Sequence, residues 1–117
     1  MTDGLTINEA AETTGWSPRM LRYIEEAGLI EPGRTDAGYR VFGPAELQRL
    51  RTLRELLAHH DCALSDVAFA KRLRTEAELG QALERWFVER PRQPEGVEGD
   101  EWLRWEQNKH ERLLAAT

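Results

Sequence analysis

The chain has 117 residues, a single cysteine and a formal net charge of −5, with 40% hydrophobic and 32% charged residues. This composition is typical of one small folded domain and excludes a disordered chain, an internal disulfide framework and a membrane span, which needs ~18 consecutive apolar residues. The charge is uneven, because residues 15–54 contain seven arginines against five acids, whereas residues 75–117 contain 6 basic and 10 acidic side chains.

Two short helices are expected near the N-terminus. The run Thr6–Glu9 has the pattern of a capping box, in which a threonine and a glutamate satisfy backbone amides at a helix start. Gly15 supplies a turn, and Ser17–Pro18 is a second start signal, with an N-cap hydroxyl followed by proline. The second helix should run to Ala27 and end at Gly28. Two helices joined by a tight turn predict a helix-turn-helix.

Residues 29–42 change to a strand-like pattern. Leu29–Pro32 and Tyr39–Phe42 flank the segment Thr35–Gly38, which predicts a β-hairpin closed by a glycine-containing turn. Pro32 lacks an amide hydrogen and confines its strand to an edge or a strand end.

Four more helices are expected after the hairpin. One starts at Gly43–Pro44 and continues to about His59, with leucines at a spacing of three to four residues, and a shorter one follows at about 66–74. A capping-box pattern at Thr75–Glu78 opens a helix that Pro91 ends, and a loop over 91–100 leads to a last helix, about 101–115.

The second helix carries the main candidate binding surface. Arg19, Arg22, Tyr23 and Glu26 share one face, whereas Leu21 and its neighbours face inward. Arginine side chains can clamp phosphates or guanine edges, and a tyrosine hydroxyl can reach a phosphate oxygen. The alternative is a solvated helix face whose arginines are held by nearby glutamates.

The hairpin favours the binding interpretation. Arg34 and Arg40 straddle its turn, with Tyr39 between them. A basic hairpin after a helix-turn-helix is a wing, which contacts DNA beside the recognition helix.

With these residues, the chain resembles the MerR family of winged helix-turn-helix regulators. The resemblance rests on Ile7–Ala11, Thr14–Ser17, Met20–Ile30 and Gly38–Phe42, and it covers about residues 5–74. It implies a mainly α fold, in which a winged helix-turn-helix domain (1–74) with a small β-hairpin wing precedes a short helical dimerisation region (75–117, with the loop at 91–100). The DNA contacts that the resemblance implies are Arg19, Arg22, Tyr23, Arg34, Tyr39, Arg40 and Arg54.

The chain departs from the family in three ways. Ile24 stands where the family usually has a second aromatic residue, the helix that ends at Pro91 is shorter than the usual dimer helix, and the sensor cysteines are missing there. The run His59–Cys62 does not suit a metal site, because adjacent helical residues point about 100° apart. We therefore expect no metal, no cofactor and no inherited effector, and we interpret Cys62 as a small buried thiol.

The C-terminal aromatic residues allow two interpretations. In the first interpretation, they line a pocket for a flat or cationic molecule. In the second, they pack the last two helices against each other or against a second subunit, and their helical spacing favours this packing. We hypothesise a short dimer seam with the last helix packed beside it. The residues expected there are Leu79, Leu83, Trp86, Phe87, Trp102 and Trp105.

These patterns favour a cytoplasmic, non-enzymatic regulator that binds double-stranded DNA as a homodimer at a near-palindromic promoter site and distorts it, with RNA polymerase as a further partner and no membrane. Two alternatives stay open. One is an excisionase-like factor that bends DNA for recombination, and the other is a protein-interaction module with an acidic tail.

Overall fold

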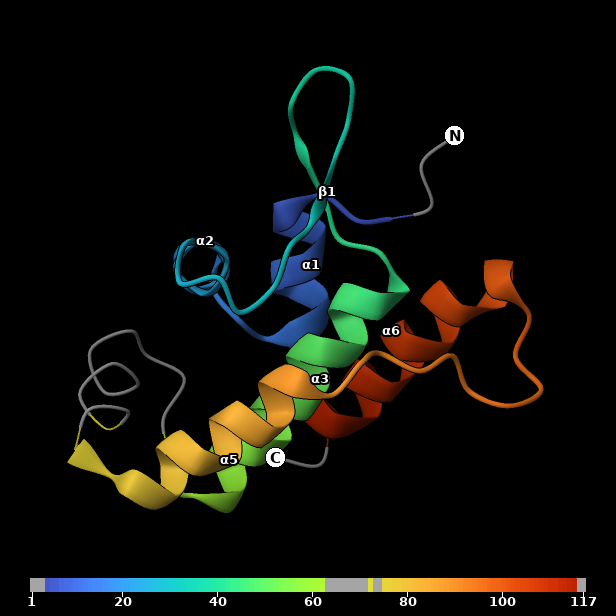
Figure 1. The fold of residues 1–117 in the computed structure, drawn as a ribbon. Helices are drawn as coiled ribbons and strands as arrows, with labels where there is room; N and C mark the ends of the chain where they lie inside the picture. The colour runs from blue at the N-terminus through green and yellow to red at the C-terminus, as the bar shows by residue number, and fades with distance from the viewer. Residues whose placement is uncertain (1–3, 63–71, 73–74, 116–117) are drawn as a thin grey trace.

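The computed structural model describes residues 4–62, 72 and 75–115. Its elements, in chain order, are α1 (Ile7–Thr14), α2 (Pro18–Glu26), β1 (Gly33–Arg34), β2 (Arg40–Val41), α3 (Pro44–His59), α5 (Ala77–Val88) and α6 (Gly99–Ala115) (Figure 1). The expected mainly helical fold with one small hairpin is confirmed. The helix expected at 66–74 lies outside the described residues, apart from Arg72.

The helix-turn-helix forms through the caps that its sequence predicts. The Thr6 hydroxyl accepts a hydrogen bond from the Glu9 amide at 3.2 Å, and the Glu9 carboxylate accepts one from the Thr6 amide at 2.9 Å. Ser17 caps α2 by accepting from the Met20 amide at 3.1 Å. Gly15, between the helices, has a φ of 81°, which favours glycine.

The hairpin is narrower than predicted. Each strand has two residues, and Arg34 pairs with Arg40 across the antiparallel ladder. The first strand begins after Pro32 instead of at Leu29, because proline cannot donate to the ladder and Ile30, only 5% exposed, is part of the core. A bridge between Leu5 and the buried Phe42 ties the base of the hairpin to the N-terminus.

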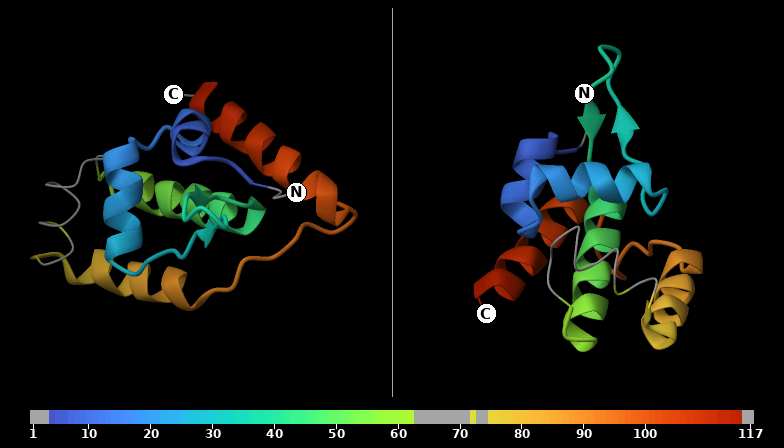
Figure 2. Two further views of the ribbon diagram at one scale, coloured as in Figure 1. Left: turned by 90° about the horizontal axis from the view of Figure 1, so that it is seen from above. Right: turned by 90° about the vertical axis from the view of Figure 1, so that its left-hand side faces the viewer.

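Helix α3 lies at the centre of the molecule. Its four leucines are fully buried (Leu47, Leu50, Leu53 and Leu57), and they share one core with Trp16, Leu21, Ile24 and Phe42. Helices α5 and α6 lie on opposite sides of α3 in both views of Figure 2. The hypothesis that the last helix packs beside the preceding one is therefore wrong, since α6 packs on α1 and α3 and α5 packs on α3.

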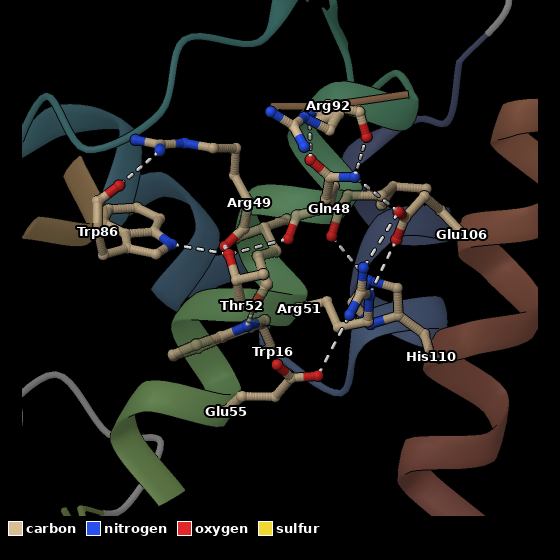
Figure 3. Close-up of polar contacts among 12 residues, drawn as sticks. Trp16, Gln48, Arg49, Arg51, Thr52, Glu55, Trp86, Arg92, Glu106 and His110 are labelled. Carbon is tan, nitrogen blue, oxygen red and sulfur yellow. Dashed lines mark hydrogen bonds and ion pairs between the residues drawn. The ribbon is translucent and has the colours of Figure 1, made fainter. Parts of the chain in front are cut away.

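Helix α6 buries polar side chains in its contact with α3. Glu106 and His110 are fully buried, and Trp102 and Trp105, the residues expected to seal the last helices or a dimer seam, are half-buried. The Glu106 carboxylate accepts hydrogen bonds from Arg51 Nε at 3.1 Å and Nη2 at 3.3 Å (Figure 3). A buried carboxylate is tolerated here because an arginine on α3 neutralises it.

Helix α5 begins one residue later than the capping-box pattern at Thr75–Glu78 predicts. Its N-cap is Glu76, which makes no side-chain capping bond, so the predicted capping box is wrong. The Glu76 carboxylate instead pairs with Arg72. At the other end, Trp86 Nε1 donates to Thr52 Oγ1 at 2.8 Å, and the Arg49 guanidinium lies 4.0 Å from the centre of a Trp86 ring (Figure 3).

We predict that Glu106→Ala lowers the free energy of unfolding by about 3 kcal/mol, because it leaves the Arg51 guanidinium partly buried without its main partner. Urea unfolding measures the loss. Glu55→Ala is the matched control, since it removes an exposed partner of the same arginine and should cost under about 1 kcal/mol. Equal losses in the two variants would contradict the structural role of Glu106.

We also predict that the protein loses stability as the pH falls below about 6.5, the ordinary pKa of histidine. His110 Nε2 donates to the Leu47 carbonyl at 2.8 Å, and burial lowers the pKa of His110. Below this pH, the unfolded chain binds a proton that the folded chain does not bind. The free energy of unfolding therefore falls by up to about 1.4 kcal/mol for each pH unit.

Urea titrations at several pH values test this linkage. His110→Gln keeps a donor for Leu47 without a titrating ring, so its stability should depend less on pH. The exposed His59→Gln serves as the control and should keep the wild-type slope. Parallel slopes for His110→Gln and the wild type would contradict the assignment.

Candidate nucleic-acid interface

The exposed face of α2 is the one that the sequence predicts. Arg19 and Arg22 are exposed and Tyr23 is half-buried, whereas Met20, Leu21 and Ile24 are buried on the opposite face. Ile24 is fully buried. The departure from the family at this position therefore changes the core and leaves the arginine face as expected.

The hairpin projects at the top of Figure 1, and α2 lies just below it in the right-hand view of Figure 2. Tyr39 is 73% exposed near the tip of the hairpin, Arg34 is exposed and Arg40 is half-buried. The structure thus brings six of the seven predicted DNA contacts to one end of the molecule, three on α2 and three on the hairpin.

Glu25 links these two elements. Its side chain is 17% exposed, and its carboxylate accepts hydrogen bonds from Arg34 Nη2 at 2.7 Å and from Arg40 Nε. The sequence pattern does not separate this glutamate from its neighbour Glu26, but the structure does, because Glu25 is half-buried against the hairpin and Glu26 is exposed. The signal that could have indicated the contact is the position of Glu25 in the last turn of α2, just before the hairpin.

The seventh predicted contact, Arg54, lies elsewhere. Its Nη1 donates to the Thr14 carbonyl at 2.9 Å, and burial lowers the pKa of Arg54. Its side chain packs closely over Gly15, where a Cβ would lie 2.5 Å from Arg54 Nη1 and 2.9 Å from Leu114 Cδ2. Arg54 therefore supports the junction of α1, α3 and α6, and its role in DNA contact stays a prediction.

Two further arginines of the basic segment hold the C-terminal helices. Arg51 binds Glu106 of α6, and Arg49 donates to the carbonyls of Trp86 at 2.8 Å and Phe87 at 3.2 Å, at the end of α5. Burial lowers the pKa of Arg49, an effect that the charge of Glu89 opposes. Four of the seven arginines, at 19, 22, 34 and 40, thus belong to α2 and the hairpin.

The residues predicted for dimerisation are divided between buried and exposed positions. Leu79 and Trp86 are buried against their own chain, whereas Leu83 is half-buried and Phe87 is 50% exposed. Beside Phe87, Val88 is 76% exposed. An apolar groove of about 420 Å³ lies between α5 and the end of α2, lined by Ala27, Gly28, Leu29, Leu83, Glu84, Phe87 and Val88.

The tryptophan rings contact the protein's own cations. Arg49 lies over Trp86, and Lys109 lies 4.9 Å from the centre of a Trp105 ring. These contacts use the indole faces that a cationic ligand would need. They favour the packing interpretation of the aromatic residues over the ligand pocket.

The described residues do not form a metal site. Cys62 is 7% exposed, the rings of His59 and His60 meet edge to face, and within the ranges given above no three histidine, cysteine or acidic residues come together as ligands. In the same ranges, no helix has the length and apolar character that crossing a membrane requires.

Helix α2 carries an arginine face, follows α1 after a tight turn and precedes a basic hairpin. This order of elements is that of the winged helix-turn-helix proteins. The family model for the MerR HTH family of regulatory proteins matches residues 5–73, which is more than half of the chain. The chain belongs to this family, which agrees with the prediction of a regulator instead of an enzyme.

Curated relatives match the same part of the chain. The chain is similar to the heavy metal-dependent transcription regulator 2 of Rhizobium meliloti, with 43% identity over 51 residues, and to the HTH-type transcriptional regulator HmrR of Sinorhizobium medicae, with 41% identity over 51 residues. A probable heavy metal-dependent transcriptional regulator of Haemophilus influenzae is also 41% identical over 51 residues. These matches cover 43% of this chain and 35–40% of each relative's length.

Proposed function

We propose that this protein is a transcriptional regulator that binds double-stranded DNA with α2 in the major groove and the hairpin on the adjacent backbone or minor groove. The observation that carries the proposal is the shared position of the α2 arginine face and the basic hairpin at one end of the molecule (Figure 1). The identity to proteins named transcriptional regulators supports it. Such a function places the protein in the cytoplasm with the chromosome.

The regulator acts as a homodimer on a near-palindromic promoter site. Two recognition helices reach successive major grooves when they lie about 34 Å apart, one helical turn of DNA. Bound in this way, the dimer distorts the promoter and changes how RNA polymerase engages it. The surface that we assign to the second copy is the apolar side of α5 at the half-buried Leu83 and the exposed Phe87 and Val88, because apolar side chains of this size are stabilised by burial.

We predict that Arg22→Ala and Arg40→Ala each weaken binding to a duplex enriched from a random pool. Loss of one phosphate contact should lower the slope of log affinity against log salt by about 1, and loss of a base contact should lower the affinity by roughly 5- to 150-fold. Fluorescence anisotropy at several salt concentrations measures both quantities.

Arg104→Ala is the control for these variants, because it removes an exposed arginine from α6, away from α2 and the hairpin. It should bind like the wild type. Unchanged binding in both Arg22→Ala and Arg40→Ala would rule out the proposed interface. Enrichment of a palindromic sequence from the pool would support the dimer. Equal binding to duplexes of any sequence would instead favour an architectural role.

We predict that Phe87→Asp shifts the monomer–dimer equilibrium toward the monomer by at least about tenfold, because it places a charge in the proposed seam. Sedimentation equilibrium measures the shift. Gln81→Glu adds a negative charge at an exposed position of the same helix and should leave the equilibrium nearly unchanged. A wild-type protein that stays monomeric at high micromolar concentration would remove the dimer from the proposal.

A further inference from the structure

Glu25 occupies an unusual place between the recognition helix and the hairpin. It is in the last turn of α2, and its two carboxylate oxygens bond to arginines on opposite strands of the hairpin, Arg34 and Arg40. These two arginines are direct partners across the ladder. Two like charges placed opposite each other repel, and a carboxylate between them offsets that repulsion.

Hydrogen bonds between Thr35 and Tyr39 close the turn of the hairpin, but little else holds its outer part against α2. Its ladder consists of only two residues on each strand, and a short isolated hairpin is marginally stable in water. The Leu5–Phe42 bridge fixes its base, but Tyr39 and residues 36–38 of the turn are exposed. Within the described part of the chain, the ion pairs of Glu25 with Arg34 and Arg40 join the outer hairpin to α2. These ion pairs therefore set the angle between the two elements.

The bond geometry leaves the arginines able to contact DNA. Arg40 uses Nε for Glu25, so that bond does not involve its two terminal amino groups. Arg34 uses Nη2 for Glu25 and donates from Nη1 to the Gly38 carbonyl at 3.4 Å, which orients its guanidinium along the turn. A guanidinium has five N–H donors in a fixed fork, so holding one side of the fork directs the other.

We propose that Glu25 is a positioning residue that determines specificity. It fixes the hairpin against α2 before DNA arrives, so that both elements meet the duplex with one spacing. The proposal rests on the DNA-binding function proposed above. Preordering of this kind raises the affinity for a site that fits the fixed spacing, since less conformational freedom is lost on binding. For duplexes without the site, Glu25 only lowers the positive charge, which weakens sequence-independent binding.

Two substitutions separate the positioning role from the charge. Glu25→Gln removes the charge and both ion pairs. Glu26→Gln removes the same charge one residue later, from an exposed side chain that makes no hydrogen bond or ion pair within the described part of the chain. Glu25→Asp keeps the charge but shortens the side chain by one methylene, so one carboxylate no longer reaches both arginines.

The experiment measures the affinity of the full chain for the duplex enriched from a random pool and for a scrambled duplex of equal length. Glu25→Gln should bind the enriched duplex at least about fivefold more weakly than Glu26→Gln does, while both variants bind the scrambled duplex equally well or better than the wild type. Glu25→Asp, like Glu25→Gln, should discriminate less between the enriched and the scrambled duplex than the wild type does. NMR relaxation without DNA should show larger backbone motion at residues 35–38 in both Glu25 variants only.

The outcomes that would overturn the proposal are distinct from a failure of the function itself. If Glu25→Gln and Glu26→Gln bind both duplexes equally, Glu25 acts only through its charge. The same conclusion follows if Glu25→Asp discriminates between the enriched and the scrambled duplex as well as the wild type does. A wild-type protein that binds neither duplex would instead remove the DNA-binding function. Circular dichroism melting of each variant checks that the fold is intact, and the relaxation data test the positioning role without DNA.

Discussion

The arrangement of the described helices depends on contacts that α3 makes with α1, α5 and α6 through its arginines. Its leucines form the core, and the arginines between them point in other directions because successive helical residues are rotated by about 100°. Arg49 reaches the end of α5, Arg51 reaches Glu106 of α6, and Arg54 reaches the end of α1. A partly buried guanidinium is stable only with such partners, so these contacts fix the C-terminal helices against the helix-turn-helix.

This use of arginine also determines what kind of surface is left for DNA. The cations that remain at the α2 end are few, and Glu25 offsets part of the charge of Arg34 and Arg40. Sequence-independent affinity grows with the number of phosphates that a protein neutralises, and base contacts add specificity. A small set of cations in fixed positions, on a chain with a net charge of −5, suits a protein that selects a site more than one that coats DNA.

The parts of the fold that the sequence predicts correctly depend on local interactions. The caps at Thr6 and Ser17 join residues three positions apart, so their pattern is sufficient to predict them. The burial of Glu106 and His110 in α6 was not predicted, since the apolar pattern of this helix indicates the side of Trp102 and Trp105, which is half-buried. A carboxylate and an imidazole become core residues only because α3 supplies Arg51 and the Leu47 carbonyl, some 55 and 63 residues earlier in the chain. No pattern within α6 contains that information.

The position of α5 connects the two surfaces proposed here. Trp86 is buried against Thr52 and Arg49, so the apolar surface that α5 still exposes is at Phe87 and Val88. The groove beside them is completed by residues 27–29, which directly follow α2. In the proposed dimer, a second copy seated in this groove would contact the segment that joins α2 to the hairpin. Glu25 precedes this segment by only two residues, so the proposed dimer contact and the proposed positioning contact lie next to each other in the chain.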